Sequence, residues 1–457
     1  MKLAPPIQNP YILQNWCYYK RMIRRMINGA FFAHDGNRIH ASPPKIHVQK
    51  KRYVIGVVID TAMAVPPTTG VTYRLYHLSR EMTRRGHCVV WILGNRNFGN
   101  RADLHQLSAV GVKIHLLPQK MFYDPECVAG ILKKEKVDVV QYEITQTFMD
   151  IGLEIRKITG LPVLLEFHDI EATLRETLGR SAESPLMKFL QYAAGEYADS
   201  VIAMTPTDMR ILIEGIGVQK EKLFLAPNGI ENKSVKMDQL ERSNNTLLFL
   251  GNLFYPPNRK GFDYLVKKIL PKLDKSVTLK SVGMAPPKLK SRYANNGRIR
   301  VLGEIKNKSL FEKEVASSTI GMCMLSAGSG MKVKILDYCR FGLPIVTTTI
   351  GASGYEGIKS LLVADSISDT IKHIKCLLSN RKYAGRVGEK NRKSARALYG
   401  WPRIAKTVEN AIALAMNFNM RGTDGYRPRP FWLEEKRHGQ AVLKNHYIID
   451  KHGIRKI

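Results

Sequence analysis

Two successive α/β patterns constrain the fold of this 457-residue chain more than any other feature of its sequence. In each pattern an apolar run leads into a glycine-containing turn and then into a helical stretch, beginning at residues 53–59 and again at 247–250. The hydrophobic content of 44% is enough for two large cores. Alternating strands and helices are typical of doubly wound parallel sheets, so we predict an α/β protein with two Rossmann-like domains facing across a cleft.

The apolar runs place the remaining strands. In the first unit we expect strands at 88–93, 112–117, 137–141, 163–167 and 200–203, with a helix at 72–85 after the loop 66–70. In the second unit we expect strands at 278–282, 300–302, 321–325 and 344–347, with a helix at 331–341 before the last of them. The segments in order are an N-terminal extension 1–52, a first domain 53–231, a polar linker 232–245, a second domain 246–400, a helix 401–420 and a tail 421–457.

The net charge of +32 is distributed unevenly along the chain. The extension 1–52 carries +9 and residues 245–400 carry +18, whereas residues 53–244 carry −1. Such a field attracts anions, including nucleotides, nucleic acid and acidic membrane surfaces. The alternative is a basic proteome that uses lysine as its default surface residue.

Cysteine usage and hydropathy indicate the compartment. The six cysteines form no CxxC pair and no histidine cluster accompanies them, which argues against a zinc site and a disulfide framework, so we expect no metal. We find neither a signal-peptide pattern nor an apolar run of the roughly 18 residues that a span needs, and we expect a cytoplasmic protein. Basic and apolar residues alternate over 11–32, which predicts an amphipathic helix either on the inner membrane face or docked on the protein itself.

The segment 326–342, SAGSGMKVKILDYCRFG, carries the strongest functional signal. A glycine-rich turn lies between an apolar strand and a helix, so free backbone N–H groups can point at an anion there. Lys332 and Lys334 add positive charge, and Asp337 lies further along the predicted helix, where a carboxylate can accept hydrogen bonds from ribose or sugar hydroxyls. The pattern therefore predicts a nucleoside diphosphate site formed by Gly328, Ser329, Gly330, Met331, Lys332, Lys334 and Asp337; a plain helix cap is the alternative.

With this segment included, residues 53–415 resemble glycosyltransferase family 4, the retaining GT-B enzymes. That family has two acidic residues separated by seven others, followed by a GxPVV segment. Asp337 stands at the second acidic position and Gly342–Val346 matches the segment, but Ser329 replaces the first acid. The resemblance implies that Asp337 holds the nucleotide ribose, while Ser329 leaves the identity of the sugar open.

Two further elements match the donor side of the family. Gly251 and Asn252, followed by Lys260 and Gly261, are similar to the family's VGRL…KG loop, with Asn252 in place of its arginine. The resemblance implies that Lys260, helped by Arg259, stabilises the leaving diphosphate, where negative charge develops.

The acceptor side is matched more weakly. Gly70 and Arg74 resemble the family's glycine-rich loop after the first strand, and His168 and Asp169 follow the strand 163–167, where α/β sheets bind ligands. The implied roles are catalysis for His168 and a place in the cleft for the others. Asn228 and Gly229 resemble the family's PNGVD element, and Trp401 resembles the tryptophan of a final helix that crosses back to the first domain.

The resemblance implies a retaining, metal-independent glycosyltransferase that moves a hexose-type sugar from a nucleoside-diphosphate sugar, its co-substrate, to a hydroxyl acceptor, with no other cofactor. A surface polysaccharide or lipid-linked glycan is the expected acceptor. A modified DNA base is an alternative, although residues 53–244, which include the first domain, have a net charge of −1. The other alternative is a non-catalytic GT-B protein that binds nucleotide or glycan, since Ser329 and Asn252 depart from the donor motif.

Overall fold

The computed structural model describes residues 52–61, 67, 69–94, 110–181, 184–231 and 245–419, and the backbone of four strands between 433 and 456. The expected amphipathic segment 11–32 and nearly all of the extension 1–52 and the linker 232–245 lie outside the described residues.

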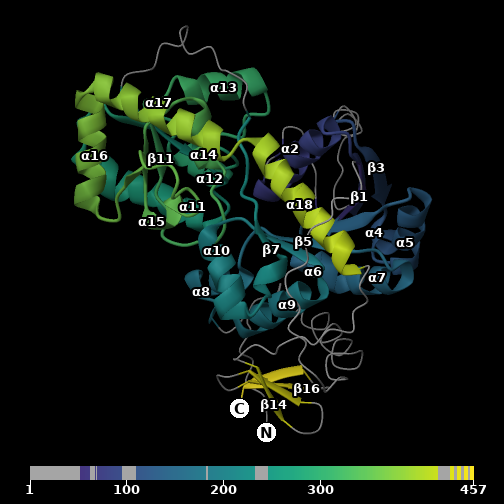
Figure 1. The fold of residues 1–457 in the computed structure, drawn as a ribbon. Helices are drawn as coiled ribbons and strands as arrows, with labels where there is room; N and C mark the ends of the chain where they lie inside the picture. The colour runs from purple at the N-terminus through teal and green to yellow at the C-terminus, as the bar shows by residue number, and fades with distance from the viewer. Residues whose placement is uncertain are drawn as a thin grey trace.

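The first domain is a seven-stranded parallel sheet with the order β3-β2-β1-β4-β5-β6-β7 (Figure 1). Most of its strands are continuous apolar runs, as expected for a parallel sheet covered by helices on both faces. They are β1 (Val54–Ile59), β2 (Cys88–Gly94), β3 (Lys113–Leu117), β4 (Val139–Tyr142), β5 (Val163–Phe167), β6 (Ser200–Ala203) and β7 (Leu223–Leu225). The strand order reverses between β1 and β4, and at such a point the carboxyl ends of the strands border a ligand crevice.

Local sequence explains how the first helix, α2 (Gly70–Arg84), forms. Thr69 caps it, accepting a hydrogen bond from the Thr72 N–H while the Thr72 side chain returns the contact. Leu75, Leu78 and Met82 follow at helical spacing and are buried against the sheet. The other helices of this domain are α4 (Gln119–Phe122), α5 (Pro125–Lys134), α6 (Thr145–Thr147), α7 (Leu153–Thr159), α8 (Glu171–Thr177), α9 (Ser184–Tyr197) and α10 (Pro206–Arg210).

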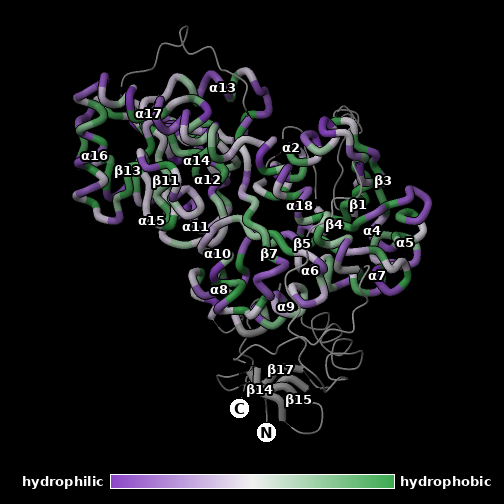
Figure 2. The backbone as a smooth tube through the Cα atoms, in the orientation of Figure 1, coloured by the Kyte–Doolittle hydropathy of each residue, from purple (hydrophilic) through white to green (hydrophobic). Residues whose placement is uncertain are grey.

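The second domain repeats this architecture with six parallel strands in the order β10-β9-β8-β11-β12-β13. The strands are β8 (Thr246–Leu250), β9 (Thr278–Val282), β10 (Ile299–Gly303), β11 (Ile320–Cys323), β12 (Ile345–Thr347) and β13 (Leu362–Val363). Its helices are α11 (Pro256–Tyr264), α12 (Pro287–Arg292), α13 (Lys308–Ala316), α14 (Lys334–Arg340), α15 (Thr349–Ala352), α16 (Ile367–Ser379) and α17 (Arg381–Leu398). Figure 2 shows the hydrophobic residues gathered on the central strands, such as β1, β4 and β5 in the first domain.

The last long helix, α18 (Trp401–Asn419), leaves the second domain and crosses to the first (Figure 1). Its buried side chains, among them Val408 and Ile412, join the same core as β1 and α2. Trp401 packs so closely on Gly229 that a Cβ at Gly229 would lie 2.4 Å from the indole ring. The two sheets and the returning helix confirm the predicted GT-B architecture.

Three features differ from the sequence-based expectation. Helix α14 begins at Lys334 instead of residue 331, and β7 and β13 were not expected because runs of two or three residues carry little periodicity. In the tail, an antiparallel four-stranded sheet was also not expected; its strands are β14 (Leu433–Lys436), β15 (Gln440–Leu443), β16 (Tyr447–Asp450) and β17 (Gly453–Lys456). Among the described residues, no helix is both long and apolar enough to cross a membrane.

Candidate functional site

The glycine-rich loop 328–331 lies between β11 and α14 and packs against the first domain. Gly328 and Gly330 have φ angles of 132° and 66°, a region that favours glycine. A Cβ on Gly330 would lie 2.3 Å from the carbonyl oxygen of His168 and 2.6 Å from Asp169 Oδ1. Only glycine therefore allows the loop to come this close to the end of β5.

Hydrogen bonds reinforce this contact between the domains. Ser329 Oγ accepts from the Ile170 N–H at 2.9 Å, and Met331 Sδ accepts from the Asn228 N–H at 3.1 Å. Gly70, at the start of α2, lies nearby, because a Cβ there would be 3.8 Å from the Val333 side chain. The structure thus brings the glycine-rich loop together with predicted residues from three separate parts of the first domain.

A partly buried lysine and two aspartates lie at the same contact. Lys332 Nζ donates to the carbonyl oxygens of Ser329 and Gly330, both at 2.7 Å, and is attracted by Asp169 and Asp208. Burial lowers the pKa of Lys332 and raises the pKa of Asp169 to about 8. Asp208 was not among the residues predicted from the sequence, although its place shortly after β6 is a signal for a ligand site.

The ammonium group of Lys334 lies where β8, α11 and α14 meet. Its Nζ donates to Asn258 Oδ1 at 2.8 Å and lies 4.5 Å from the centre of the Phe249 ring. A Cβ on Gly251 would lie 2.9 Å from the same Nζ, and Asn258 Nδ2 donates to the carbonyl oxygen of Asn252 at 3.0 Å. Burial lowers the pKa of Lys334 to about 8. The predicted residues Gly251, Asn252 and Lys334 are therefore neighbours.

Asp337 follows Lys334 by three residues. It lies within the first turn of α14, because this helix starts later than expected. Its carboxylate is partly buried, and burial raises its pKa to about 7 against the opposing charge of Arg340. No hydrogen bond to this carboxylate is found among the residues that the structure describes. It is therefore available to accept hydrogen bonds from a ligand.

Lys260 and Arg259 lie on α11, apart from this group. Arg259 Nε pairs with both carboxylate oxygens of Asp263 at 3.1 Å. Lys260 is exposed, and at about 100° per residue it lies about 200° around the helix from Asn258, the residue that touches Lys334. The structure does not bring Lys260 to Lys334, so its catalytic role stays a prediction.

Arg74, expected on the acceptor side of the cleft, is completely buried. Its Nε and Nη2 donate to the two carboxylate oxygens of Glu166, and its Nη1 donates to the carbonyl oxygen of Pro227 at 2.8 Å. The side chain has no exposed surface with which to bind an acceptor. Its position instead ties α2 to β5 and to the segment that carries Asn228.

Glu143, just after β4, lies beside both the buried Arg74–Glu166 pair and His168. His168 Nε2 lies 2.7 Å from Glu143 Oε2, and Gln141 Nε2 donates to Glu143 Oε1 at 2.6 Å and to Glu166 Oε1 at 3.2 Å. Burial raises the pKa of both glutamates and lowers the pKa of His168 to about 4. Possible metal-ligating atoms of Glu143, Glu166 and His168 lie within 4.8 Å of one another, but Arg74 already supplies positive charge to this cluster.

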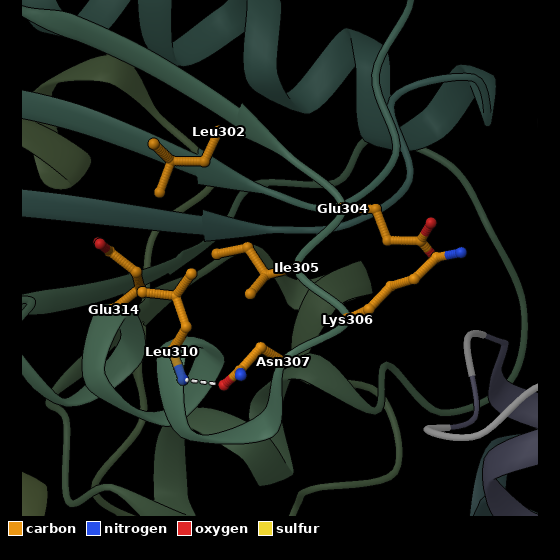
Figure 3. Close-up of a pocket in the computed structure, with 7 residues that line it drawn as sticks. All are labelled: Leu302, Glu304, Ile305, Lys306, Asn307, Leu310 and Glu314. Carbon is orange, nitrogen blue, oxygen red and sulfur yellow. Dashed lines mark hydrogen bonds between the residues drawn. The ribbon is translucent and has the colours of Figure 1, made fainter.

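A shallow cavity of about 350 Å³ lies elsewhere, at the end of β10 and the start of α13 (Figure 3). Within it, Asn307 Oδ1 accepts from the Leu310 N–H at 2.9 Å and caps α13. Its lining residues are Leu302, Glu304, Ile305, Lys306, Asn307, Leu310 and Glu314. None of them is a candidate from the sequence, and the glycine-rich loop does not line it, so we do not assign the site to this cavity.

Two family models match the chain, one in each domain. The model of Glycosyltransferase Family 4 matches residues 68–233, and that of Glycosyl transferases group 1 matches residues 244–380. Each matched segment covers most of one Rossmann-like domain, and together they include the loop 328–331, Asp337 and His168.

One curated relative and two solved structures extend the comparison. An uncharacterized 44.6 kDa protein in the cps region of Klebsiella pneumoniae is 27% identical over 136 residues, which is 26% of this chain; the match spans a third (33%) of that relative's length. HepE of Anabaena, solved with UDP and glucose, has a TM-score of 0.59 at 15% identity, over 78% of this chain and 98% of its own. WaaG, a glycosyltransferase involved in lipopolysaccharide biosynthesis, has a TM-score of 0.54 at 14% identity, over 78% and 99%. These two structures share the fold of this chain.

Proposed function

Because this chain is a family 4-like glycosyltransferase of the GT-B type, we propose that it transfers a hexose-type sugar from a nucleoside-diphosphate sugar to a hydroxyl group, with retention of configuration. The observation that carries this proposal is the pair formed by Lys334 and Asp337 in the first turn of α14. The Lys334 ammonium group suits the diphosphate of a nucleotide. The Asp337 carboxylate, to which no hydrogen bond is found among the described residues, suits the ribose of the same nucleotide.

Each group has a distinct part in the proposed reaction. The ammonium group of Lys334 would offset the charge that grows on the leaving diphosphate as the bond to the sugar breaks. The Asp337 carboxylate would accept hydrogen bonds from the ribose hydroxyls and fix the nucleotide. His168, whose carbonyl touches the glycine-rich loop, would lie beside the transferred sugar and the incoming acceptor hydroxyl. With positive charge supplied by lysines, we propose a metal-independent reaction.

For the acceptor we propose a surface polysaccharide or a lipid-linked glycan. Support comes from the partial similarity to a protein in a cps region and from the fold shared with an enzyme of lipopolysaccharide biosynthesis. The net charge of +18 on residues 245–400 suits an anionic donor. We propose that the reaction takes place in the cytoplasm, at the inner membrane face.

Asp337→Ala is expected to weaken binding of the cognate nucleotide about 10- to 100-fold, the loss expected when hydrogen bonds to a charged group disappear. The measurement is thermal stabilisation of the purified protein by UDP, GDP, ADP, dTDP and their sugar conjugates, since a ligand stabilises in proportion to its occupancy. The unliganded variant should melt no lower than the parent, because it loses a carboxylate that is costly to bury.

Asp274→Ala, at an exposed carboxylate of the same domain, is the matched control and should keep full affinity. Unchanged nucleotide affinity in Asp337→Ala would remove this residue from the site. If no nucleotide stabilises the parent protein, the chain is instead a GT-B protein that does not bind such donors.

Donor binding is expected to depend on pH with a maximum between about pH 7 and 8. The raised pKa of Asp337, about 7, means that its carboxylate accepts ribose hydrogen bonds only once pH rises past that value. The lowered pKa of Lys334, about 8, means that its charge is lost as pH rises further. Calorimetric titration with a sugar nucleotide, whose pyrophosphate does not titrate in this range, should show both limbs.

Asp337→Asn should remove the acid limb of this profile and leave the alkaline limb in place. The assignment of the two groups fails if affinity stays constant from pH 6 to pH 9 in the parent protein.

A further inference from the structure

We infer that Glu143 is a positioning residue for the proposed transfer reaction: it binds His168 Nε2 and thereby presents Nδ1 of the imidazole to the substrates. The inference rests on the proposed function for its catalytic consequence. The contact itself, however, is a property of the fold and can be measured without any substrate.

The first support is the geometry of the contact. Glu143 is 1% exposed, and its Oε2 lies 2.7 Å from His168 Nε2, a short distance for a hydrogen bond that involves a charged or shared proton. Gln141 Nε2 fixes the other oxygen, Oε1, at 2.6 Å. The carboxyl group is thus held from both sides, and the imidazole cannot turn over without breaking the contact.

The second support is the remaining ring nitrogen. No hydrogen bond to His168 Nδ1 is found within the described part of the chain, and this atom is not among the buried polar atoms that lack a partner. Since the side chain is 10% exposed, Nδ1 is the nitrogen that solvent or substrate can reach. In a neutral imidazole the partner of one nitrogen decides whether the other donates or accepts.

The third support is charge balance. Arg74 is the cation of this buried cluster, and its Nε and Nη2 groups donate to the two carboxylate oxygens of Glu166. Glu143 is a second buried carboxyl group beside this pair, so two acids share the positive charge of Arg74, and burial of the second acid is unfavourable unless it has further partners. Its side-chain partners are Gln141, Glu166 and His168, and of these His168 has the most exposed side chain.

The fourth support is where the histidine lies. His168 follows β5 at the carboxyl edge of the sheet, and its carbonyl oxygen would lie 2.3 Å from a Cβ on Gly330 of the donor loop. The imidazole ring of His168 therefore starts from the part of the backbone where the two domains contact each other. An imidazole held in one orientation there would face the same sugar in every turnover.

The first experiment is ¹⁵N NMR of histidine-labelled protein, with His168→Asn used to assign the His168 signals. We expect one dominant tautomer in the parent and an averaged pair of ring nitrogens in Glu143→Leu. Glu143→Gln should retain the ring orientation but mix the tautomers, because an amide can donate or accept. A His168 spectrum unchanged in both folded variants would overturn the inference, whether or not the protein transfers sugar.

The second experiment measures turnover of the sugar nucleotide selected by thermal shift, followed as release of nucleoside diphosphate. We expect Glu143→Leu to lower kcat about 10- to 100-fold with donor affinity within twofold of the parent. Glu143→Gln should recover a large part of this loss. The double variant Glu143→Leu/His168→Ala should be no slower than His168→Ala alone, because both act through one group.

Fully additive losses in the double variant would contradict positioning through His168. If Glu143→Leu does not fold, Glu143→Gln decides the question by the same NMR and kinetic comparisons. If the parent protein binds no nucleotide, that result would count against the proposed function, and the NMR comparison would still decide whether Glu143 orients His168.

Discussion

Replacing Arg74 with methionine is expected to lower the free energy of unfolding by about 3–5 kcal/mol, one of the largest single effects in this protein. Arg74 has no exposed surface; its guanidinium binds Glu166, and its charge also acts on Glu143, which Gln141 links to Glu166. Without the guanidinium two buried carboxyl groups lose their counter-charge, and the Pro227 carbonyl loses its donor. Denaturant unfolding followed by tryptophan fluorescence measures the change.

Arg84→Met is the matched control, because the Arg84 side chain is 61% exposed and pairs with Glu81 only at 3.8 Å. Such surface pairs contribute about 0–1 kcal/mol. A second replacement, Glu166→Gln in the Arg74→Met background, should restore part of the lost stability by removing one unpaired charge. If Arg74→Met is as stable as Arg84→Met, the buried network does not hold the first domain together.

Lys334→Ala is expected to lower the turnover of the donor about 100- to 1000-fold, the effect of removing one group that stabilises charge in a transition state. Lys334 lies beside Asn258 and Gly251 and precedes Asp337 by three residues, at the place where the diphosphate is proposed to bind. Donor affinity should fall less than turnover, because the charge on the leaving group grows during the reaction. Steady-state and single-turnover kinetics separate the two effects.

Lys260→Ala tests the competing assignment from the sequence. Lys260 is exposed on the far side of α11 from Asn258, so we expect its replacement to lower turnover less than tenfold. A larger loss in Lys260→Ala than in Lys334→Ala would show that the lysine identified by resemblance is the one that acts on the leaving group.

The sequence was sufficient for most of the fold because long apolar runs and helical spacing are local signals. The strands 163–167, 200–203 and 278–282 have the predicted bounds. The start of α14 was misplaced because Met331, Lys332 and Val333, which follow Gly330, fit a helix as well as a loop. In the structure this loop instead contacts the first domain, with Gly330 against the carbonyl group of His168. The two residues are 162 positions apart in the chain, so no local pattern predicts their contact.

The candidate site was only partly predictable, for a similar reason. An arginine on a helix pattern after a glycine-rich loop suggests a ligand contact, yet Arg74 is buried because Glu166 faces it from β5. The signal for this pair was present: Glu166 interrupts the buried apolar run VLLEF, where an acid needs a partner. Which residue supplies that partner depends on how the sheet is assembled, and a single sequence does not reveal it.

The crossing helix has a consequence for the order of events during synthesis. All seven strands of the first sheet have been synthesised once β7 is made, but α18, which packs into the same core, is translated only after the whole second domain. At ordinary rates of about 5–20 residues per second the gap lasts roughly 10–40 seconds. During that time the nascent first domain exposes the apolar surface later covered by Val408 and Ile412, and this surface is a natural binding place for chaperones.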